Sequence, residues 1–152
     1  MTRPFLDTSI LLGGLIDFGP PSAAPLKVLD ILAQTSGTRS LTAWHCCLEL
    51  FSVATRLPEE FRLSPSMARE LVESEIFARM EVLSLDSNHE KELLLKAESN
   101  RISGGRIHDF HIGQIALLHQ ATVFVTENKK HFQHLQQSGL PVCSAAEFLN
   151  TQ

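Results

Sequence analysis

Short apolar segments that end on polar residues alternate along this chain with longer stretches of helical pattern. The segments gather β-branched and aromatic residues, whereas the stretches between them place apolar residues three and four apart. Strands that alternate with helices favour an α/β domain whose central sheet is mostly parallel. We expect five strands, at residues 5–6, 38–42, 80–85, 121–126 and 140–144.

The length and composition of the chain fit one folded domain. Its 152 residues suit a single domain over residues 1–152, and 43% of them are hydrophobic and 20% charged, as in ordinary soluble globular proteins. A formal net charge of -4 argues against a broad basic surface for nucleic acid. It leaves room for a nuclease, because a cluster of acids that holds metal is negative until the metal binds.

Nothing in the sequence points to a membrane or to an oxidising compartment. It has no apolar run long enough to span a bilayer and no N-terminal signal pattern, so we expect the cytoplasm as location and no membrane partner. The cysteines Cys46, Cys47 and Cys143 are odd in number and two are adjacent. This pattern favours buried free thiols over a disulfide framework.

Four polar side chains fall where the expected elements end or begin. Asp7 ends the first strand, and Glu49 lies on the helix that follows the second strand. Asp109 opens the helix before the fourth strand, and Asn128 follows that strand. In open parallel sheets, ligands bind beyond the carboxyl ends of the strands, near the switch in strand order. We therefore expect these four side chains to face one cleft.

This set of side chains suits a hard divalent cation. Mg²⁺ and Mn²⁺ prefer oxygen ligands, usually a few carboxylates together with water and substrate phosphate. Asp7, Glu49 and Asp109 are the expected metal ligands, and Asn128 is a fourth catalytic position. A bound metal lowers the pKa of a water molecule and stabilises charge on a phosphate, and two metals would clamp the attacking and leaving oxygens. The hydroxyls expected to orient ligands or water are those of Thr8, Ser9 and Thr126.

Each of these residues also has a purely structural explanation. Asp7 can cap the helix or turn that follows it, and Glu49 can be a solvated helix residue facing His45. Asp109 can be a helix cap or a first-turn acid that interacts with the helix dipole, and Asn128 can be a turn residue. Only the expected convergence of all four favours a site.

The helix that carries Glu49 is expected at residues 42–57, with Thr42 as its N-terminal cap. Its apolar stripe lies opposite a polar face that includes Glu49, which is the pattern of a helix packed on a core. The predicted stripe consists of Trp44, Cys47, Leu48, Phe51 and Ala54.

Histidine pairs and a glycine pair offer weaker signals. His108 and His111 are three apart, as are His131 and His134, yet no partner set with zinc spacing accompanies them. A zinc site is therefore not expected. The segment 104–106 can approach a phosphate through Arg106, although a Gly-Gly pair is more often a flexible loop before a helix.

Four segments resemble, in order, the PIN-domain ribonucleases, especially the VapC-like toxins of bacterial and archaeal type II toxin–antitoxin pairs. The segments are FLDTSILL, CLELFSVATR, GGRIHDFHIGQIAL and VFVTENKKHF, and the SAAEFL ending is also similar. Together they span nearly the whole chain. The resemblance implies a three-layer α/β/α PIN-like fold with a central mostly parallel sheet, and hydrolysis of RNA that depends on Mg²⁺ or Mn²⁺.

The resemblance also implies roles by position. Asp7, Glu49 and Asp109 match the family's three core acids, and Thr126 matches the threonine that opens the last motif. Asn128 falls where many members have a fourth acid and others have asparagine, and Glu127 is an alternative for that place. An amide there removes one negative charge, so we expect one metal in the resting protein, or a second one bound only with substrate.

The function implied is an endoribonuclease toxin held in check by a small antitoxin protein, and a homodimer is compatible with the apolar helix surface. The alternative is a PIN-domain nucleic-acid-binding or regulatory protein with little or no nuclease turnover. Two other doubly wound families are disfavoured. A phospho-acceptor receiver needs paired acids after the first strand and a lysine after the last, and a haloacid-dehalogenase phosphatase needs an acid where Ser9 stands.

Overall fold

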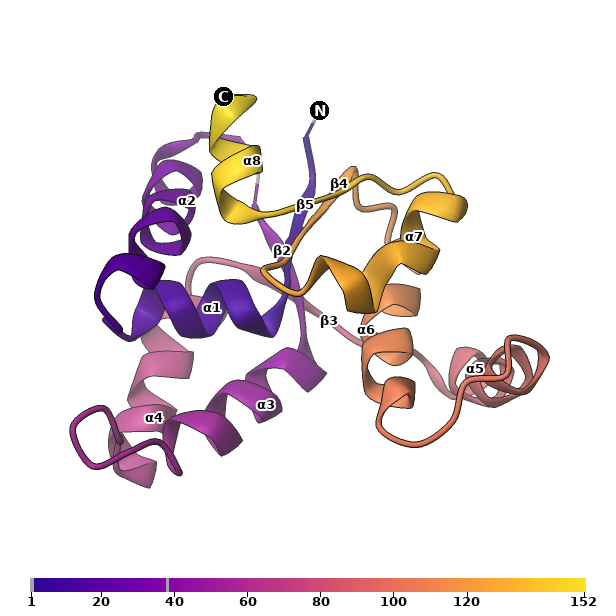
Figure 1. The fold of residues 1–152 in the computed structure, drawn as a ribbon, viewed down its shortest axis with the longest axis horizontal. Helices are drawn as coiled ribbons and strands as arrows, with labels where there is room; N and C mark the ends of the chain where they lie inside the picture. The colour runs from indigo at the N-terminus through magenta and orange to yellow at the C-terminus, as the bar shows by residue number, and fades with distance from the viewer. Residues whose placement is uncertain (1, 38) are drawn as a thin grey trace.

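A parallel β-sheet forms the middle of the molecule, with helices on both of its faces (Figure 1). The structure, a computed structural model, describes residues 2–37 and 39–152, so position 38 of the second expected strand lies outside the described residues. Within these ranges the sheet has five strands, paired in parallel in the order β3-β2-β1-β4-β5. The predicted three-layer α/β/α fold is confirmed. The strands are β1 (Pro4–Leu6), β2 (Leu41–Ala43), β3 (Glu81–Leu83), β4 (Val123–Val125) and β5 (Val142–Cys143).

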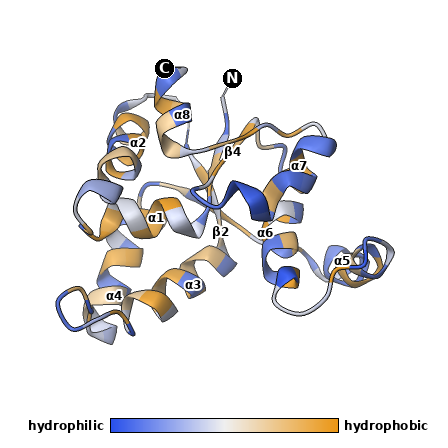
Figure 2. Ribbon diagram, in the orientation of Figure 1, coloured by the Kyte–Doolittle hydropathy of each residue, from blue (hydrophilic) through white to orange (hydrophobic). Residues whose placement is uncertain are grey.

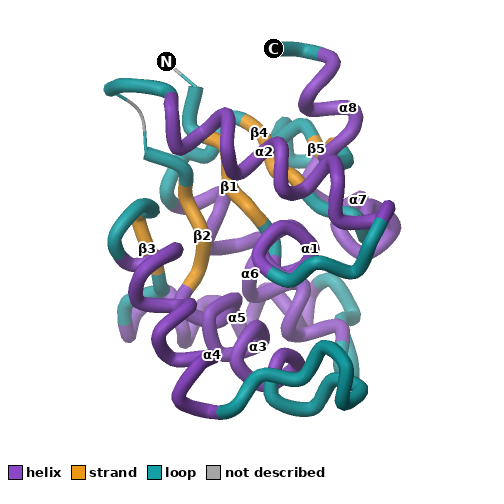
Figure 3. Tube along the Cα trace, turned by 90° about the vertical axis from the view of Figure 1, so that its left-hand side faces the viewer, coloured by secondary structure: helices purple, strands orange, loops and turns teal. Residues whose placement is uncertain are grey.

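The helices form two layers, one on each face of the sheet, and Figure 3 shows the strands side by side in the order β3-β2-β1-β4-β5. One layer contains α1 (Thr8–Leu15), α2 (Ala23–Gln34), α3 (Trp44–Ala54), α4 (Pro65–Leu71) and α8 (Ala145–Asn150). The other contains α5 (Ser87–Ser99), α6 (Arg106–Leu118) and α7 (Gln133–Gln137). Short segments are η1 (Pro20–Ser22), the π-helical η2 (Val72–Phe77) that continues α4, and η3 (Lys129–Phe132). Within the described ranges, no helix is long and apolar enough to cross a membrane.

The core of the sheet is built on stacked phenylalanines. Phe5 and Phe124 face each other in register between β1 and β4, and their rings stack with centroids 5.1 Å apart. Phe132 from η3 packs against Phe124 with ring centroids 4.5 Å apart, and all three side chains are buried. Because η3 follows β4 directly, this contact ties the segment after the strand to the core.

The adjacent glycines of α1 allow α2 to approach it closely. A Cβ atom on Gly14 would lie 2.5 Å from Cδ1 of Leu29 and 3.1 Å from the carbonyl oxygen of Pro25. Both contacts are shorter than ordinary van der Waals separation, so a larger residue would push the two helices apart. The Gly-Gly pair that weakens α1 by propensity therefore serves the packing of α1 on α2.

Thr42 does not cap α3, and that prediction is wrong. The N-cap position belongs to Ala43, which forms no side-chain capping hydrogen bond, and Thr42 is the middle residue of β2. The Thr42 hydroxyl is buried and donates a hydrogen bond to the carbonyl oxygen of Leu6 at 2.8 Å. The sequence alone does not distinguish a threonine that caps a helix from one inside a short strand that precedes the helix. Here Thr42 belongs to the strand.

The predicted apolar stripe of α3 is only partly buried. Cys47 and Ala54 face the core, whereas Trp44, Leu48 and Phe51 are 47%, 49% and 38% exposed. The exposed members line a groove of about 420 Å³ together with residues of α4 and η2. Figure 2 shows hydrophobic residues along both α3 and α4. The stripe therefore extends beyond the core and forms an apolar surface, which we call the α3 groove.

The three cysteines are free thiols, as predicted. Cys46 and Cys47 are buried and Cys143 is half-buried. Burial raises the pKa of Cys46 to about 12 and the pKa values of Cys47 and Cys143 to about 11. Since the thiolate is the reactive form, these residues act as small apolar packing groups at neutral pH.

Candidate active site

The site lies where the order of the strands switches, between β1 and β4. The chain moves outward from β1 to β2 and β3, then returns to place β4 on the other side of β1. Hydrogen bonds continue beyond the strands, because the N–H of Asp7 donates to the carbonyl oxygen of Val125 at 3.1 Å. The residues that follow β1 and β4 are thereby held side by side at the carboxyl edge of the sheet.

Asp7 occupies the N-cap position of α1, but its side chain makes no capping hydrogen bond. Its Oδ2 accepts hydrogen bonds from the Thr126 hydroxyl at 2.7 Å and from the Ser9 hydroxyl at 3.0 Å. The two hydroxyl oxygens lie 3.3 Å apart, and Asp7 is only 4% exposed. The carboxylate is thus oriented toward the edge of the sheet and is not used to cap the helix.

Burial disfavours the ionised form of Asp7. Desolvation raises the pKa of its carboxyl group above the ordinary value, although the hydrogen bonds from Thr126 and Ser9 act in the opposite direction. Within the described residues, no lysine or arginine forms an ion pair with Asp7. A buried carboxylate without a cationic partner gains from a bound cation.

Glu49 comes from α3 and is linked to the first strand through Thr8. The Thr8 hydroxyl donates to Glu49 Oε1 at 3.3 Å, and His45 Nε2 lies 3.7 Å from the same oxygen. Burial raises the pKa of Glu49 first, and the charges of Asp7 and Asp109 raise it further. The effect of Asp109 matters for the site, because it shows that carboxylates from three separate elements lie within electrostatic reach of Glu49 or of one another.

Asp109 lies in the first turn of α6 and does not open the helix as predicted. The helix begins at Arg106 after the N-cap Gly105, so Asp109 is its fourth residue. Its Oδ2 lies 3.2 Å from Nδ1 of His131, which comes from η3. In the sequence His131 stands out only as part of a weak zinc pair, because its partner Asp109 is distant in the chain and local spacing does not reveal it.

The segment after β4, which carries the fourth catalytic position, is held mainly through its backbone N–H groups. The N–H of Asn128 donates to the Thr126 hydroxyl at 3.0 Å, and the N–H of Glu127 donates to the Ser9 hydroxyl at 3.0 Å. The carboxylate of Glu127 accepts a hydrogen bond from the N–H of Ala145 at 2.8 Å, so it is engaged with the start of α8. Glu127 and Asn128 are the two candidates for the fourth catalytic position. Of these, Asn128 is bound through its backbone N–H, whereas the side chain of Glu127 is bound to α8.

Three histidines pack together next to Glu49, a cluster that sequence spacing did not reveal. The His45 ring stacks on His108 with centroids 5.2 Å apart and lies 5.1 Å from His111. The pKa of His45 is lowered by burial first, and then by His111 and His108. The neutral form of His45 is therefore favoured. His45 meets the pair on α6 because α3 brings its ring against theirs.

The donor set fits a hard cation in its chemistry. In the described part of the chain, no group of three or more His, Cys, Asp or Glu side chains is arranged closely enough to hold a metal ion. The carboxylates of Asp7, Glu49 and Asp109 nevertheless supply the oxygen ligands that Mg²⁺ and Mn²⁺ prefer, and their mutual repulsion is relieved by a cation. Binding of metal would require these side chains to draw together.

A protein-family model for the PIN domain matches residues 5–137. The chain belongs to the PIN-domain family. The matched segment runs from β1 into α7 and includes each residue that the sequence analysis proposed for the site.

This PIN domain is similar to named relatives over most of its length. It is 27% identical to Ribonuclease VapC27 of Mycobacterium tuberculosis over 139 residues, in an alignment that covers 84% of this chain and 98% of the relative. Solved structures of VapBC2 from Rickettsia felis bound to promoter DNA and of VapBC-1 from Haemophilus influenzae have TM-scores of 0.64 and 0.65. Their identities are 18% and 19%, and the matches cover 94% and 95% of this chain and 98% and 99% of theirs. At these identities the two structures establish the shared fold.

We predict that Asp7→Asn stabilises the metal-free protein at neutral pH. A carboxyl group whose pKa is raised by folding binds more protons in the folded state, so stability falls as pH rises above about 4. The variant removes one such group and should flatten this decline. Its thermal midpoint at neutral pH should rise by about 2–4 °C for each kcal/mol gained.

The measurement is thermal unfolding in EDTA across the acidic and neutral range. Asp30→Asn, on the exposed face of α2, is the matched control and should follow the wild type. An Asp7→Asn midpoint at or below that of the wild type at neutral pH would show that burial does not strain this carboxylate.

Proposed function

We propose that this PIN-domain protein is a metal-dependent endoribonuclease that hydrolyses phosphodiester bonds of RNA, and that it is the toxin of a toxin–antitoxin pair. The observation that carries the proposal is the buried Asp7 carboxylate at the strand-order switch, held there by the hydroxyls of Thr126 and Ser9. Asp7 and Asp109 also raise the pKa of Glu49, after burial, from two other elements. Repelling carboxylates at the carboxyl edge of a parallel sheet form a donor set for a hard cation. The similarity to Ribonuclease VapC27 supports RNA as the substrate.

In this proposal the three acids share one role, and two hydroxyls orient one of the acids. Asp7, Glu49 and Asp109 hold Mg²⁺ or Mn²⁺, and the bound cation supplies a water of lowered pKa and positive charge for the phosphate. The hydroxyls of Thr126 and Ser9 keep the Asp7 carboxylate in one orientation, which limits the reorganisation needed when substrate binds.

His131 gives the site a further polar side chain beside the acids. Its Nδ1 faces Asp109 Oδ2, and 60% of its side chain is exposed, so a bound RNA strand can reach the ring. With Nδ1 next to the carboxylate, Nε2 is the ring atom left to form a hydrogen bond with a bound RNA strand.

A second candidate function is nucleic-acid binding or regulation with little or no turnover. Two observations favour it: the amide of Asn128 at the fourth position, and the separation of the acids in the described part of the chain. Under this alternative the chain binds RNA, and metal changes neither the RNA nor the affinity.

We predict that the purified chain cuts single-stranded RNA with Mg²⁺ or Mn²⁺ and not with EDTA. Asp7→Asn and Asp109→Asn should each lower the rate by about a hundredfold or more, because each removes a charged metal ligand. Asp86→Asn is the matched control, since Asp86 is exposed and caps α5, a position that asparagine also fills well.

The outcomes separate the two functions. Cutting that survives in both site variants would point to a contaminant and refute the site. Metal-independent RNA binding without cutting by any form would favour the regulatory alternative.

Asn128→Asp should strengthen metal binding. A fourth carboxylate adds one negative charge at the edge of the acid cluster, and we expect the Kd for Mn²⁺ to fall about fivefold or more. Titration calorimetry with Mn²⁺ measures this, with Asn88→Asp on exposed α5 as the control. An unchanged Kd and stoichiometry would remove the support for one-metal occupancy in the resting protein.

We infer that the restraining partner is a small antitoxin that docks in the α3 groove. The groove presents Trp44, Leu48 and Phe51 to solvent on the helix that carries Glu49. An exposed apolar surface of this kind is typical of a protein interface. A partner bound there would reach the acids with the segment that leaves the groove.

A protein encoded by a short reading frame directly upstream should co-purify with the tagged chain. Leu48→Asp should abolish the co-purification, because it places a charge in the apolar groove. Leu94→Asp is the control, as Leu94 is 67% exposed on α5, away from the groove. Loss of the partner in both variants, or in neither, would contradict docking in the groove.

A further inference from the structure

A cavity beside Asp109 carries several basic side chains. It has a volume of about 610 Å³ and lies between the start of α6 and the η3–α7 segment. Its polar lining comes from Arg106, Asp109, Lys130, His131, Gln133, His134 and Gln137. Figure 2 shows hydrophilic colours along α7, which forms one wall. We call this cavity the α6 subsite.

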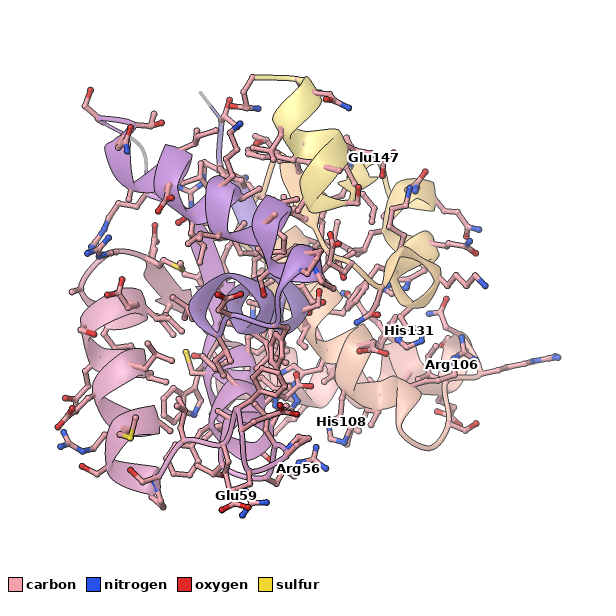
Figure 4. All side chains as sticks on the ribbon, turned by 60° about the vertical axis from the view of Figure 1, so that its left-hand side comes forward. Arg56, Glu59, Arg106, His108, His131 and Glu147 are labelled. Carbon is pink, nitrogen blue, oxygen red and sulfur yellow. The ribbon has the colours of Figure 1, made fainter. Side chains whose placement is uncertain are left out.

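The cations of the α6 subsite are not neutralised within the protein. In the described ranges, neither Arg106 nor Lys130 forms an ion pair. The neighbouring Lys129, by contrast, is held by Glu147 at 2.6 Å. Figure 4 shows Arg106 and His131 near the start of α6, although they come from different elements. A chain with net charge -4 therefore keeps two uncompensated positive charges next to its acid cluster.

His134 forms part of the wall of the cavity. Its Nε2 is buried without a hydrogen-bond partner in the described part of the chain, and a Cβ on Gly113 would lie 2.9 Å from it. The ring is thus packed on α6 and forms the rear of the cavity. Arg106 and His134 line the same cavity, and the pKa of His134 is lowered by burial first and then by Arg106.

We propose that the α6 subsite binds a backbone phosphate of the RNA strand, next to the phosphate that is cut, through Arg106 and Lys130. Asp109 is common to the acid cluster and to the wall of the subsite. A strand whose scissile phosphate lies at the acids therefore carries a neighbouring phosphate into the cavity. The two cations offset the repulsion between the acid cluster and the RNA backbone. This inference rests on the proposed ribonuclease function.

The binding of RNA can be measured apart from its cleavage. The probe is a fluorescein-labelled single-stranded RNA oligonucleotide of mixed sequence, and the readout is anisotropy with the full chain in EDTA over a range of salt. Arg106→Gln and Lys130→Gln should each raise Kd about three- to tenfold, and each should reduce the slope of log affinity against log salt by about 0.7. Lys129→Gln is the matched control and should bind as the wild type does, because its charge is engaged by Glu147.

The salt slope distinguishes a phosphate contact from a general loss of structure. A variant that is merely less stable would contain a smaller fraction of folded protein. Its folded fraction would release as many counterions as the wild type, so the salt slope would stay the same. If Arg106→Gln and Lys130→Gln match Lys129→Gln in both Kd and slope, the subsite is refuted. The same holds if they keep RNA affinity but lose the co-purifying protein, because the cavity would then serve a protein partner.

Failure of the subsite and failure of the proposed function give different results. If the wild type cuts RNA in a metal- and Asp7-dependent manner while the two variants keep their KM, the function stands and the subsite falls. If no form cuts RNA but the two variants bind it less tightly with reduced salt slopes, the subsite stands and the nuclease function falls.

Discussion

Burial of the Asp7 carboxylate between β1 and β4 is the constraint on which the rest of the site depends. An ionised carboxylate loses much of its hydration there, and the hydroxyls of Thr126 and Ser9 return only part of it. The same two hydroxyls accept the N–H groups that shape the segment after β4. One buried acid thereby organises both strand ends, and a bound cation would offset the cost of ionising it there.

The sheet brings the other acids to this point. Because β4 returns to the side of β1 opposite β2, α6 and α3 approach the same edge from opposite layers of the fold. Across that edge the charge of Asp109 contributes to the raised pKa of Glu49. Packing against the core supports the arrangement from behind, through the ring contact of Phe132 with Phe124 after β4. Arg106 and Lys130, beside Asp109, provide positive charge for a phosphate of the RNA next to the negatively charged acids.

Features that depend on neighbours in sequence were predictable, and features that depend on neighbours in space were less so. The alternation of strands and helices, and the polar residues after β1 and β4, follow from periodicity alone. Three outcomes required tertiary contacts. Thr42 lies in β2, where its hydroxyl donates a hydrogen bond to the carbonyl oxygen of Leu6. Helix α6 begins two residues earlier than the pattern predicts. His131 reaches Asp109 from a segment that has no periodicity to read.

The central claim is that Asp7, Glu49 and Asp109 form one cation site. The most direct test is the crystal structure of the protein soaked in Mn²⁺, with anomalous difference density to locate the ion. The account predicts an anomalous peak contacted by oxygen atoms of all three carboxylates, which draw together around it. A peak held instead by His45, His108 and His111, with none at the acids, would contradict it.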